Sequence, residues 1–332
     1  AEKRHCLALR GHHIVVDGLS MNVVLREIGT IYSALAQDRE CALEESLQFG
    51  QYIQWRREEA NEKHEKYWLE KLAGPLPALN LPVDRPPPPL KTYRGGRQAL
   101  VLDADLCQKV ARLSRENGCT PFMTFFSIYA LWIHRLTGQD DIIVGIPVAG
   151  RPAESGYDKL VGYCTHLLPI RSEVEDGDDF PVYLKRMRGV LLDAYQHQNY
   201  SFADLINRLN LHRDGSHSPL VSTVFNLDRP GEAPPMAGIE VSWASAPVQF
   251  TAFDITVNLT EVADQFILEC DFNRDVFDSD SIERFIGHFQ TLMAGAVEDP
   301  ESRIAALPLL DGEERQRLLV EWNDARTEYP RD

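Results

Sequence analysis

The sequence has little of what a metal, nucleotide or nucleic-acid protein needs. Its six cysteines form no CxxC pair, and no glycine-rich loop of the P-loop or dinucleotide-binding type is present, so we expect no bound metal or nucleotide cofactor. Acidic residues outnumber basic ones by 50 to 34, and the net charge of −16 disfavours nucleic acid or an anionic membrane as a partner. Scattered free cysteines, with no signal peptide and no long apolar run, predict a cytoplasmic protein.

What is present is typical of a globular α/β protein. The 332 residues, 44% hydrophobic and 25% charged, suffice for one large domain or two modest ones. Apolar periodicity predicts alternating helices and strands over the whole chain, hence an α/β or mixed class. Helices are expected over 24–35, 47–72, 104–116, 121–137, 180–197 and 281–297, and strands over 6–16, 97–102, 141–147, 220–227, 253–259 and 266–273.

A proline-rich stretch divides the chain. Residues 74–90 read GPLPALNLPVDRPPPPL. Proline fixes φ and removes a backbone donor, so this stretch is expected to be neither a helix nor an inner strand. It is predicted to be a stiff, extended connector between two lobes.

The segment HHIVVDG, residues 12–18, carries the clearest chemical signal. If it ends a strand, His12 and His13 face opposite sides, and one can face a cleft. A neutral imidazole can accept a proton from an amine near physiological pH, whereas Asp17 is costly to bury without an arginine partner. From spacing alone, a core histidine with a turn-forming Asp-Gly is the commoner interpretation. A two-ligand metal site is the least favoured, because no third ligand lies nearby.

This segment resembles the HHxxxDG signature of nonribosomal peptide synthetase condensation domains, which belong to the chloramphenicol-acetyltransferase-like superfamily. Further segments resemble motifs of the same family in the same order. They are FGQYIQW (49–55), LVGYCTHLLPIR (160–171), HQNYSFADLI (197–206), RDGSHSPL (213–220), FDITVNL (253–259) and FNRDVFD (272–278). Residues 318–332, LLVEWNDARTEYPRD, resemble the junction that leads into an adenylation domain. Cys164, Thr165 and His166 depart from the usual Phe-Val-Asn, which is compatible with a subtype of the family.

The resemblance implies an α/β, two-lobed, chloramphenicol-acetyltransferase-like sandwich. The family's earliest motifs are not found, so we expect the N-terminal lobe to be incomplete here. The implied organisation is a remainder of the N-terminal lobe with the signature (1–80), a proline-rich inter-lobe connector (81–92), a C-terminal lobe (93–310) and a linker toward an adenylation domain (311–332).

The resemblance also implies a reaction. A condensation domain forms an amide between a donor acyl or peptidyl thioester and an acceptor aminoacyl thioester. Both are presented on phosphopantetheine by upstream and downstream peptidyl carrier proteins, and the condensation domain itself binds no cofactor directly. An adjoining adenylation domain is the third implied partner. The alternatives are an epimerization domain or other acyltransferase of the superfamily, and a noncatalytic remnant that only docks carrier proteins.

Site residues follow from the matched motifs. His13 is implied to position or deprotonate the acceptor amine, while His12 is implied to be structural. Asp17 is implied to hold its loop through an arginine. The remaining implied site residues are Gly18, which lets the backbone approach the pantetheine arm; Arg151, the partner of Asp17 unless it is a surface residue; and Asn226 and His166, which would line the substrate tunnel.

Overall fold

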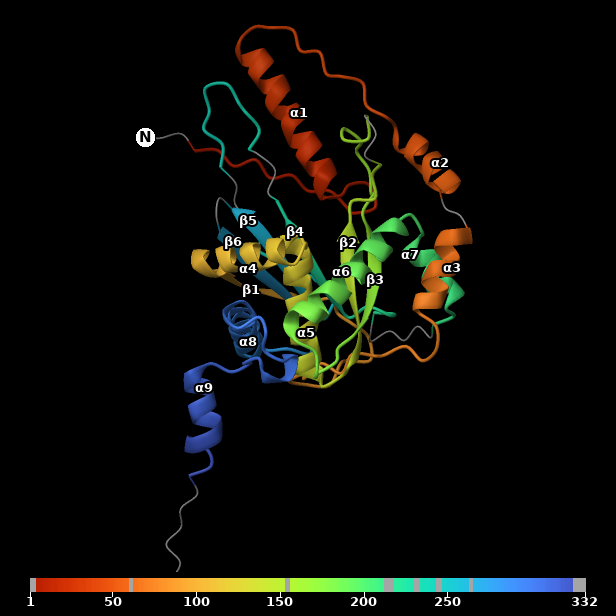
Figure 1. Ribbon diagram of the computed structural model, residues 1–332. Helices are drawn as coiled ribbons and strands as arrows, with labels where there is room; N and C mark the ends of the chain where they lie inside the picture. Colours follow the sequence, from red (N-terminus) through yellow and green to blue (C-terminus); the bar gives the residue numbers. More distant parts are fainter. Residues whose placement is uncertain are drawn as a thin grey trace, which may run out of the picture.

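The computed structural model describes residues 4–59, 62–152, 156–211, 218–229, 233–242, 247–262 and 265–324. Its centre is a six-stranded mixed sheet in the order β1-β6-β5-β4-β2-β3 (Figure 1). The strands are β1 (Gly95–Val101), β2 (Asp141–Val148), β3 (His166–Glu173), β4 (Thr223–Asp228), β5 (Ile255–Val262) and β6 (Gln265–Asn273). β2, β4 and β5 run parallel to one another, and β3 and β6 run antiparallel to them. The carboxyl ends of β2, β4 and β5 therefore meet at one edge of the sheet.

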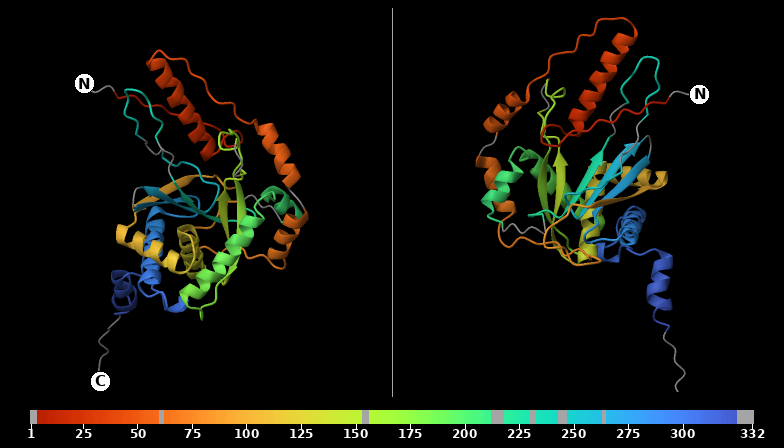
Figure 2. Two further views of the ribbon diagram at one scale, coloured as in Figure 1. Left: turned by 45° about the horizontal axis from the view of Figure 1, so that its top comes forward. Right: turned by 180° about the vertical axis from the view of Figure 1, so that it is seen from behind.

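Helices cover one face of this sheet and extend beyond its edges (Figures 1 and 2). The helices on that face are α4 (Ala104–Glu116), α5 (Pro121–Thr137), α6 (Phe180–Gln196) and α8 (Ser279–Glu298). The others are α1 (Gly18–Ala36), α2 (Phe49–Glu59), α3 (Glu62–Lys71), α7 (Phe202–Arg208) and α9 (Gly312–Gln316), with a short 3₁₀ turn at Ile304–Ala306 and a π turn at Arg317–Glu321. α1 stands at the edge to which β2 and β4 point (Figure 2). No helix of the described residues is long and apolar enough to cross a membrane.

α5 is the central core helix, and its limits agree with the sequence. Thr120 caps its start by accepting a hydrogen bond from the backbone N–H of Met123, and Pro121 occupies the first turn. Gly138 ends it in the left-handed conformation, with φ of 68°. The helix is buried continuously from Met123 to His134, which explains why it is apolar nearly all round.

Two predictions about the N-terminal part are wrong. Residues 6–16 form no strand, and residues 4–15 are exposed. A β-branched sequence becomes a strand only beside a partner that satisfies its backbone groups; here the chain instead turns, as the Val15 N–H bonds the His12 carbonyl over 3.0 Å. The single helix expected over 47–72 is described as two helices, α2 and α3; residues 60–61 lie outside the described part.

α1 forms where a helix was expected, yet much of its apolar stripe faces outward. Val23 and Ala34 are buried, whereas Ile31, Tyr32 and Leu35 are exposed. Hydrophobic periodicity predicted the helix correctly, but it does not report which side of a helix the fold covers.

The proline-rich stretch is extended, as predicted, and it is fastened to the start of α8. The Asp84 carboxylate accepts hydrogen bonds from the Ser281 hydroxyl over 2.7 Å and from the Asp278 backbone N–H over 2.7 Å. Leu76, Leu79 and Leu81 pack on the main core. The segment is therefore packed against the described core rather than being a free tether.

A pair of buried histidines holds α3 against the end of α6. The Nδ1 atoms of His64 and His197 lie 2.9 Å apart, and the His197 ring stacks on Tyr67 with a centroid separation of 4.0 Å. One imidazole must donate and the other accept, so at least one ring is neutral. Burial, and then neighbouring positive charge, lowers the pKa of both histidines below 6.5.

This histidine pair predicts loss of stability in mild acid. Below a pH of about 6.5, the unfolded chain binds protons that the folded chain does not, so the free energy of unfolding falls as pH decreases. We expect a loss on the order of 1 kcal/mol between about pH 7 and pH 5, measured by urea unfolding. The double change His64→Gln and His197→Gln should reduce this dependence to the part that the buried His166 contributes, while His5→Gln, at an exposed position, should preserve it. An unchanged slope in the double variant would contradict this assignment.

Candidate functional site

Asp17 is the centre of a buried polar cluster at the edge where β2 ends. It caps the start of α1 by accepting from the Ser20 N–H over 2.8 Å, and it accepts from the Cys164 N–H over 3.0 Å. The Arg151 Nη2 atom lies 2.8 Å from its Oδ1 atom. The two side chains are only 1% and 6% exposed. Asp17 and Arg151 are therefore a buried ion pair joining the signature loop to the turn after β2.

Electrostatics keep the Asp17 carboxylate charged. Burial alone would raise its pKa, but hydrogen bonds from Ser20 and Cys164 and the charge of Arg151 outweigh burial, and the net effect is a lowered pKa. With its oxygens occupied by donors, Asp17 is suited to holding the loop rather than to exchanging protons.

Ser20 connects the same cluster to the loop that leads into β3. Its hydroxyl lies 2.7 Å from Asp17 Oδ1 and 2.8 Å from the Gly162 carbonyl oxygen, and it accepts from the Gly162 N–H over 3.0 Å. A Cβ atom on residue 162 would stand 2.2 Å from the Phe49 ring. Only glycine therefore allows this loop to lie between α1 and α2.

The turn after β2 aims Arg151 at Asp17. Gly150 has a φ of 64°, a left-handed conformation that favours glycine, and an added Cβ would lie 2.2 Å from the Cys164 carbonyl oxygen. The Tyr52 hydroxyl donates to the Gly150 carbonyl over 2.9 Å and lies 3.3 Å from that of Cys164. Burial raises the pKa of Tyr52 to about 12, so it remains a donor. α2 thus holds the Gly150 turn in place through the Tyr52 hydroxyl.

The two signature histidines have opposite hydrogen-bond roles. His13 Nδ1 lies 3.1 Å from the Val16 carbonyl oxygen, which can only accept, so Nδ1 carries the proton and Nε2 is left as an acceptor. His12 Nδ1 accepts from the Ile14 N–H over 3.1 Å, so in the neutral ring its proton is on Nε2. His13 is exposed, and its ring meets the Tyr163 ring edge-on at 5.8 Å between centroids. Of the two signature histidines, His13 therefore has its Nε2 atom available as an acceptor, whereas the Nδ1 acceptor of His12 is already engaged.

His166 is built into the loop structure of the site. Its pKa is lowered by burial first and by the charge of Arg56 second, so the ring is neutral. Its Nε2 atom lies 2.5 Å from the Gln198 carbonyl oxygen, and Arg56 Nη1 lies 3.3 Å from its Nδ1 atom. Both ring nitrogens face protein groups, which fits packing better than proton transfer.

The remaining expected residues lie at the same end of the sheet. Gly18 begins α1, and a Cβ placed on it would meet nothing within 4 Å, so the space beside it is open. Asn226 lies near the carboxyl end of β4, and its amide donates to Asn258 Oδ1 over 2.9 Å. Within the described residues, no group of three or more His, Cys, Asp or Glu side chains could hold a metal ion.

Sequence reasoning missed Ser20, Tyr52 and Gly162 as site residues. Each acts by a contact to a segment about 100 or more residues away, at separations of 142 for Ser20–Gly162 and 98 for Tyr52–Gly150. Two of these residues could have been found by their position in the sequence, because Tyr52 and Gly162 lie in the motif-like segments 49–55 and 160–171. Of the motif-like segment 213–220, residues 213–217 lie outside the described part.

Comparison with known proteins identifies the family of the chain. The family model "Condensation domain" matches residues 1–319. The chain is 38% identical over 97% of its length to one component of the linear gramicidin synthase of Brevibacillus parabrevis, and 36% identical over its full length to surfactin synthase subunit 1 of Bacillus subtilis. The chain belongs to the condensation-domain family.

Solved structures give the same fold. A four-domain nonribosomal peptide synthetase crystallised with AMP and glycine superposes with a TM-score of 0.80 at 19% identity, covering 91% of this chain and 24% of that one. The expected α/β condensation-domain fold is therefore confirmed. The chain spans only 6% of the gramicidin synthase component and 9% of the surfactin synthase component.

Proposed function

We propose that this chain forms an amide bond between a donor acyl or peptidyl thioester and an acceptor aminoacyl thioester. The observation that carries the proposal is His13: an exposed imidazole whose Nδ1–H is committed to Val16, leaving Nε2 as an acceptor. Its loop is held by the buried Asp17–Arg151 pair. Membership of the condensation-domain family supports the same reaction.

The reaction follows from this arrangement. The acceptor amine donates a hydrogen bond to His13 Nε2 and attacks the donor thioester carbon. The C–N bond forms as the C–S bond breaks. His13 receives the proton that the amine loses and then passes that proton to the departing thiolate. An α-amine has a pKa of about 8, so only modest assistance is needed at neutral pH, and positioning supplies much of the rate.

The other site residues position His13 and the substrates. Asp17 and Arg151 hold the signature loop against the sheet, and His12 stabilises the turn through the Ile14 N–H. The open space beside Gly18 accommodates a pantetheine arm. Asn226 and His166 lie at the same end of the sheet and would contribute to the walls of a substrate tunnel.

The partners follow from the reaction. Upstream and downstream carrier proteins present both thioesters on phosphopantetheine, and the chain binds no further cofactor. The likeness of residues 318–332 to a family junction supports an adjoining adenylation domain; residues 325–332 lie outside the described part. The enzyme would act in the cytoplasm as one stage of a multidomain synthetase.

Dependence on a free acceptor amine tests the reaction type. The chain is incubated with a donor-loaded carrier and an aminoacyl-loaded carrier, and intact mass spectrometry follows the acceptor carrier. We expect its mass to rise by the donor acyl group when the amine is free and to stay constant when the amine is acetylated. Binding of both carriers without this mass increase would favour a noncatalytic docking role instead.

A further inference from the structure

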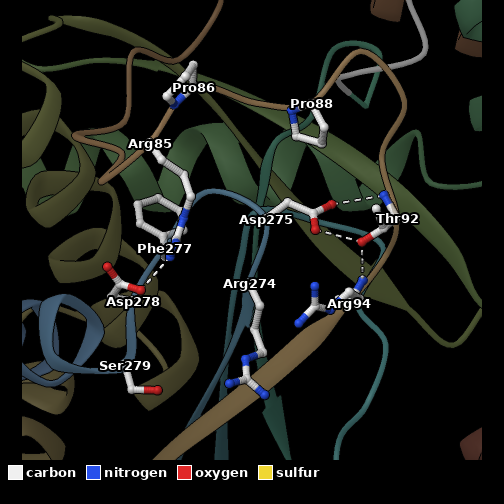
Figure 3. Close-up of a pocket in the computed structure, with 10 residues that line it drawn as sticks. All are labelled: Arg85, Pro86, Pro88, Thr92, Arg94, Arg274, Asp275, Phe277, Asp278 and Ser279. Atoms are coloured by element: carbon white, nitrogen blue, oxygen red, sulfur yellow. Dashed lines mark hydrogen bonds and ion pairs between the residues drawn. The ribbon is translucent and has the colours of Figure 1, made fainter.

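A cavity of about 390 Å³ lies far from the signature loop, between the proline-rich segment and the start of α8. It is lined by Arg85, Arg94 and Arg274 among other residues (Figure 3). Arg94 precedes β1 and Arg274 follows β6, where Gly95 pairs with Asn273. This is the sheet edge opposite to the carboxyl ends of β2 and β4, so the cavity is separate from the Asp17 cluster.

The charges of the cavity are only partly balanced. Arg85 is paired with Asp278. The Asp275 carboxylate accepts two hydrogen bonds from Thr92, one from the backbone N–H over 2.9 Å and one from the hydroxyl over 2.6 Å. Across the described ranges, the guanidinium groups of Arg94 and Arg274 make no ion pair or side-chain hydrogen bond. The backbone nevertheless holds these two residues together, because the Arg274 N–H donates to the Arg94 carbonyl over 2.9 Å.

Backbone strain occurs at the same place. Tyr93, between Thr92 and Arg94, has a φ of 61°, an unfavourable left-handed conformation for a bulky residue. It is held by the Thr251 N–H, which donates to the Tyr93 carbonyl over 2.9 Å, and by the Thr92–Asp275 contacts. Such strain persists where the surrounding structure enforces it, often at ligand sites. Here the left-handed conformation of Tyr93 directs the backbone so that the next residue, Arg94, lines the cavity.

We propose that this arginine pocket binds a phosphate group, free or as an ester. Arg94 and Arg274 line the same pocket, and a phosphate dianion matches both their charge and their forked donors. Three arginines and two aspartates line the pocket, so its lining carries one net positive charge in a chain of net charge −16. Pro86 and Pro88 lie across the pocket from Arg94 and Arg274, and the organic part of an ester would lie against these prolines (Figure 3).

The test is a titration of the whole chain with inorganic phosphate and, separately, glycerol phosphate, by calorimetry at constant ionic strength. We expect saturable binding, and the double change Arg94→Gln and Arg274→Gln should weaken it by about tenfold or more for each arginine. The double change Arg112→Gln and Arg229→Gln alters the net charge equally at exposed ion pairs elsewhere, and it should leave binding unchanged.

The outcomes separate the two sources of phosphate. Tighter binding of glycerol phosphate assigns the pocket to an ester, and equal or tighter binding of inorganic phosphate assigns it to the free ion. Absence of saturable binding with either probe overturns the proposal. So does binding that survives the loss of Arg94 and Arg274, or that weakens equally in the control variant.

Discussion

Replacing Arg151 by alanine is expected to lower the free energy of unfolding by about 3–5 kcal/mol, because it leaves the Asp17 carboxylate buried without its countercharge. The two side chains are 6% and 1% exposed, so the remaining carboxylate is largely shielded from bulk water. Arg151 also donates to the Ser20 hydroxyl over 2.9 Å, and this contact disappears as well. Urea unfolding followed by circular dichroism measures the loss.

Two further variants separate this ion pair from general effects. The double change Asp17→Asn and Arg151→Met removes both charges, so it should destabilise the protein less than Arg151→Ala does alone. Arg229→Ala removes an ion pair with Glu261 in which the arginine is 82% exposed, and it should change the stability by less than about 1 kcal/mol. An Arg151→Ala variant as stable as Arg229→Ala would mean that the pair does not hold the signature loop.

The second large effect concerns His13. Replacing it by alanine should slow amide formation by about 10²- to 10⁴-fold, the contribution typical of a positioned proton acceptor. The side chain is exposed, so its loss should leave the unfolding curve nearly unchanged, and the defect should appear in the rate alone. Single-turnover kinetics with both carriers loaded give the rate of the chemical step.

His12→Ala is the matched control. It removes a neighbouring imidazole of the same size, whose Nδ1 atom is engaged by the Ile14 N–H. We expect the rate of this variant to stay much closer to that of the unchanged protein. Equal losses in both variants would show that the histidines act together in shaping the turn, and the tautomer argument for His13 would then fail.

Local signals predicted much of the fold correctly, and the errors have a physical cause. The limits of α4 and α5 follow from caps and glycines close to them in the sequence. β3 was not identified as a strand, because Pro169 interrupts its pattern and its central residues are buried on both faces. Residues 6–16 have a strand-like composition, but a strand requires a partner that local sequence does not report.

The site likewise contains some residues that the sequence indicated and others that it did not. The signature loop was recognisable from its residues, and the family resemblance supplied Arg151 as the partner of Asp17, across a separation of 134 residues. Tyr52, which fixes the Gly150 turn, follows no local rule, since its function depends on two backbone carbonyls that only the folded chain brings together. Nor does the sequence indicate that Arg94 and Arg274 share one cavity.

Transfer of an isotopically labelled acyl group from donor carrier to acceptor carrier, in a single turnover with the unaltered chain, tests the central claim most directly. The predicted result is label on the acceptor carrier, released by mild base as an N-acylated amino acid, because base cleaves the thioester and spares the new amide. Label that remains on the donor carrier, or appears only as the free acid at the rate seen without the chain, would contradict the assignment of this protein as an amide-forming enzyme.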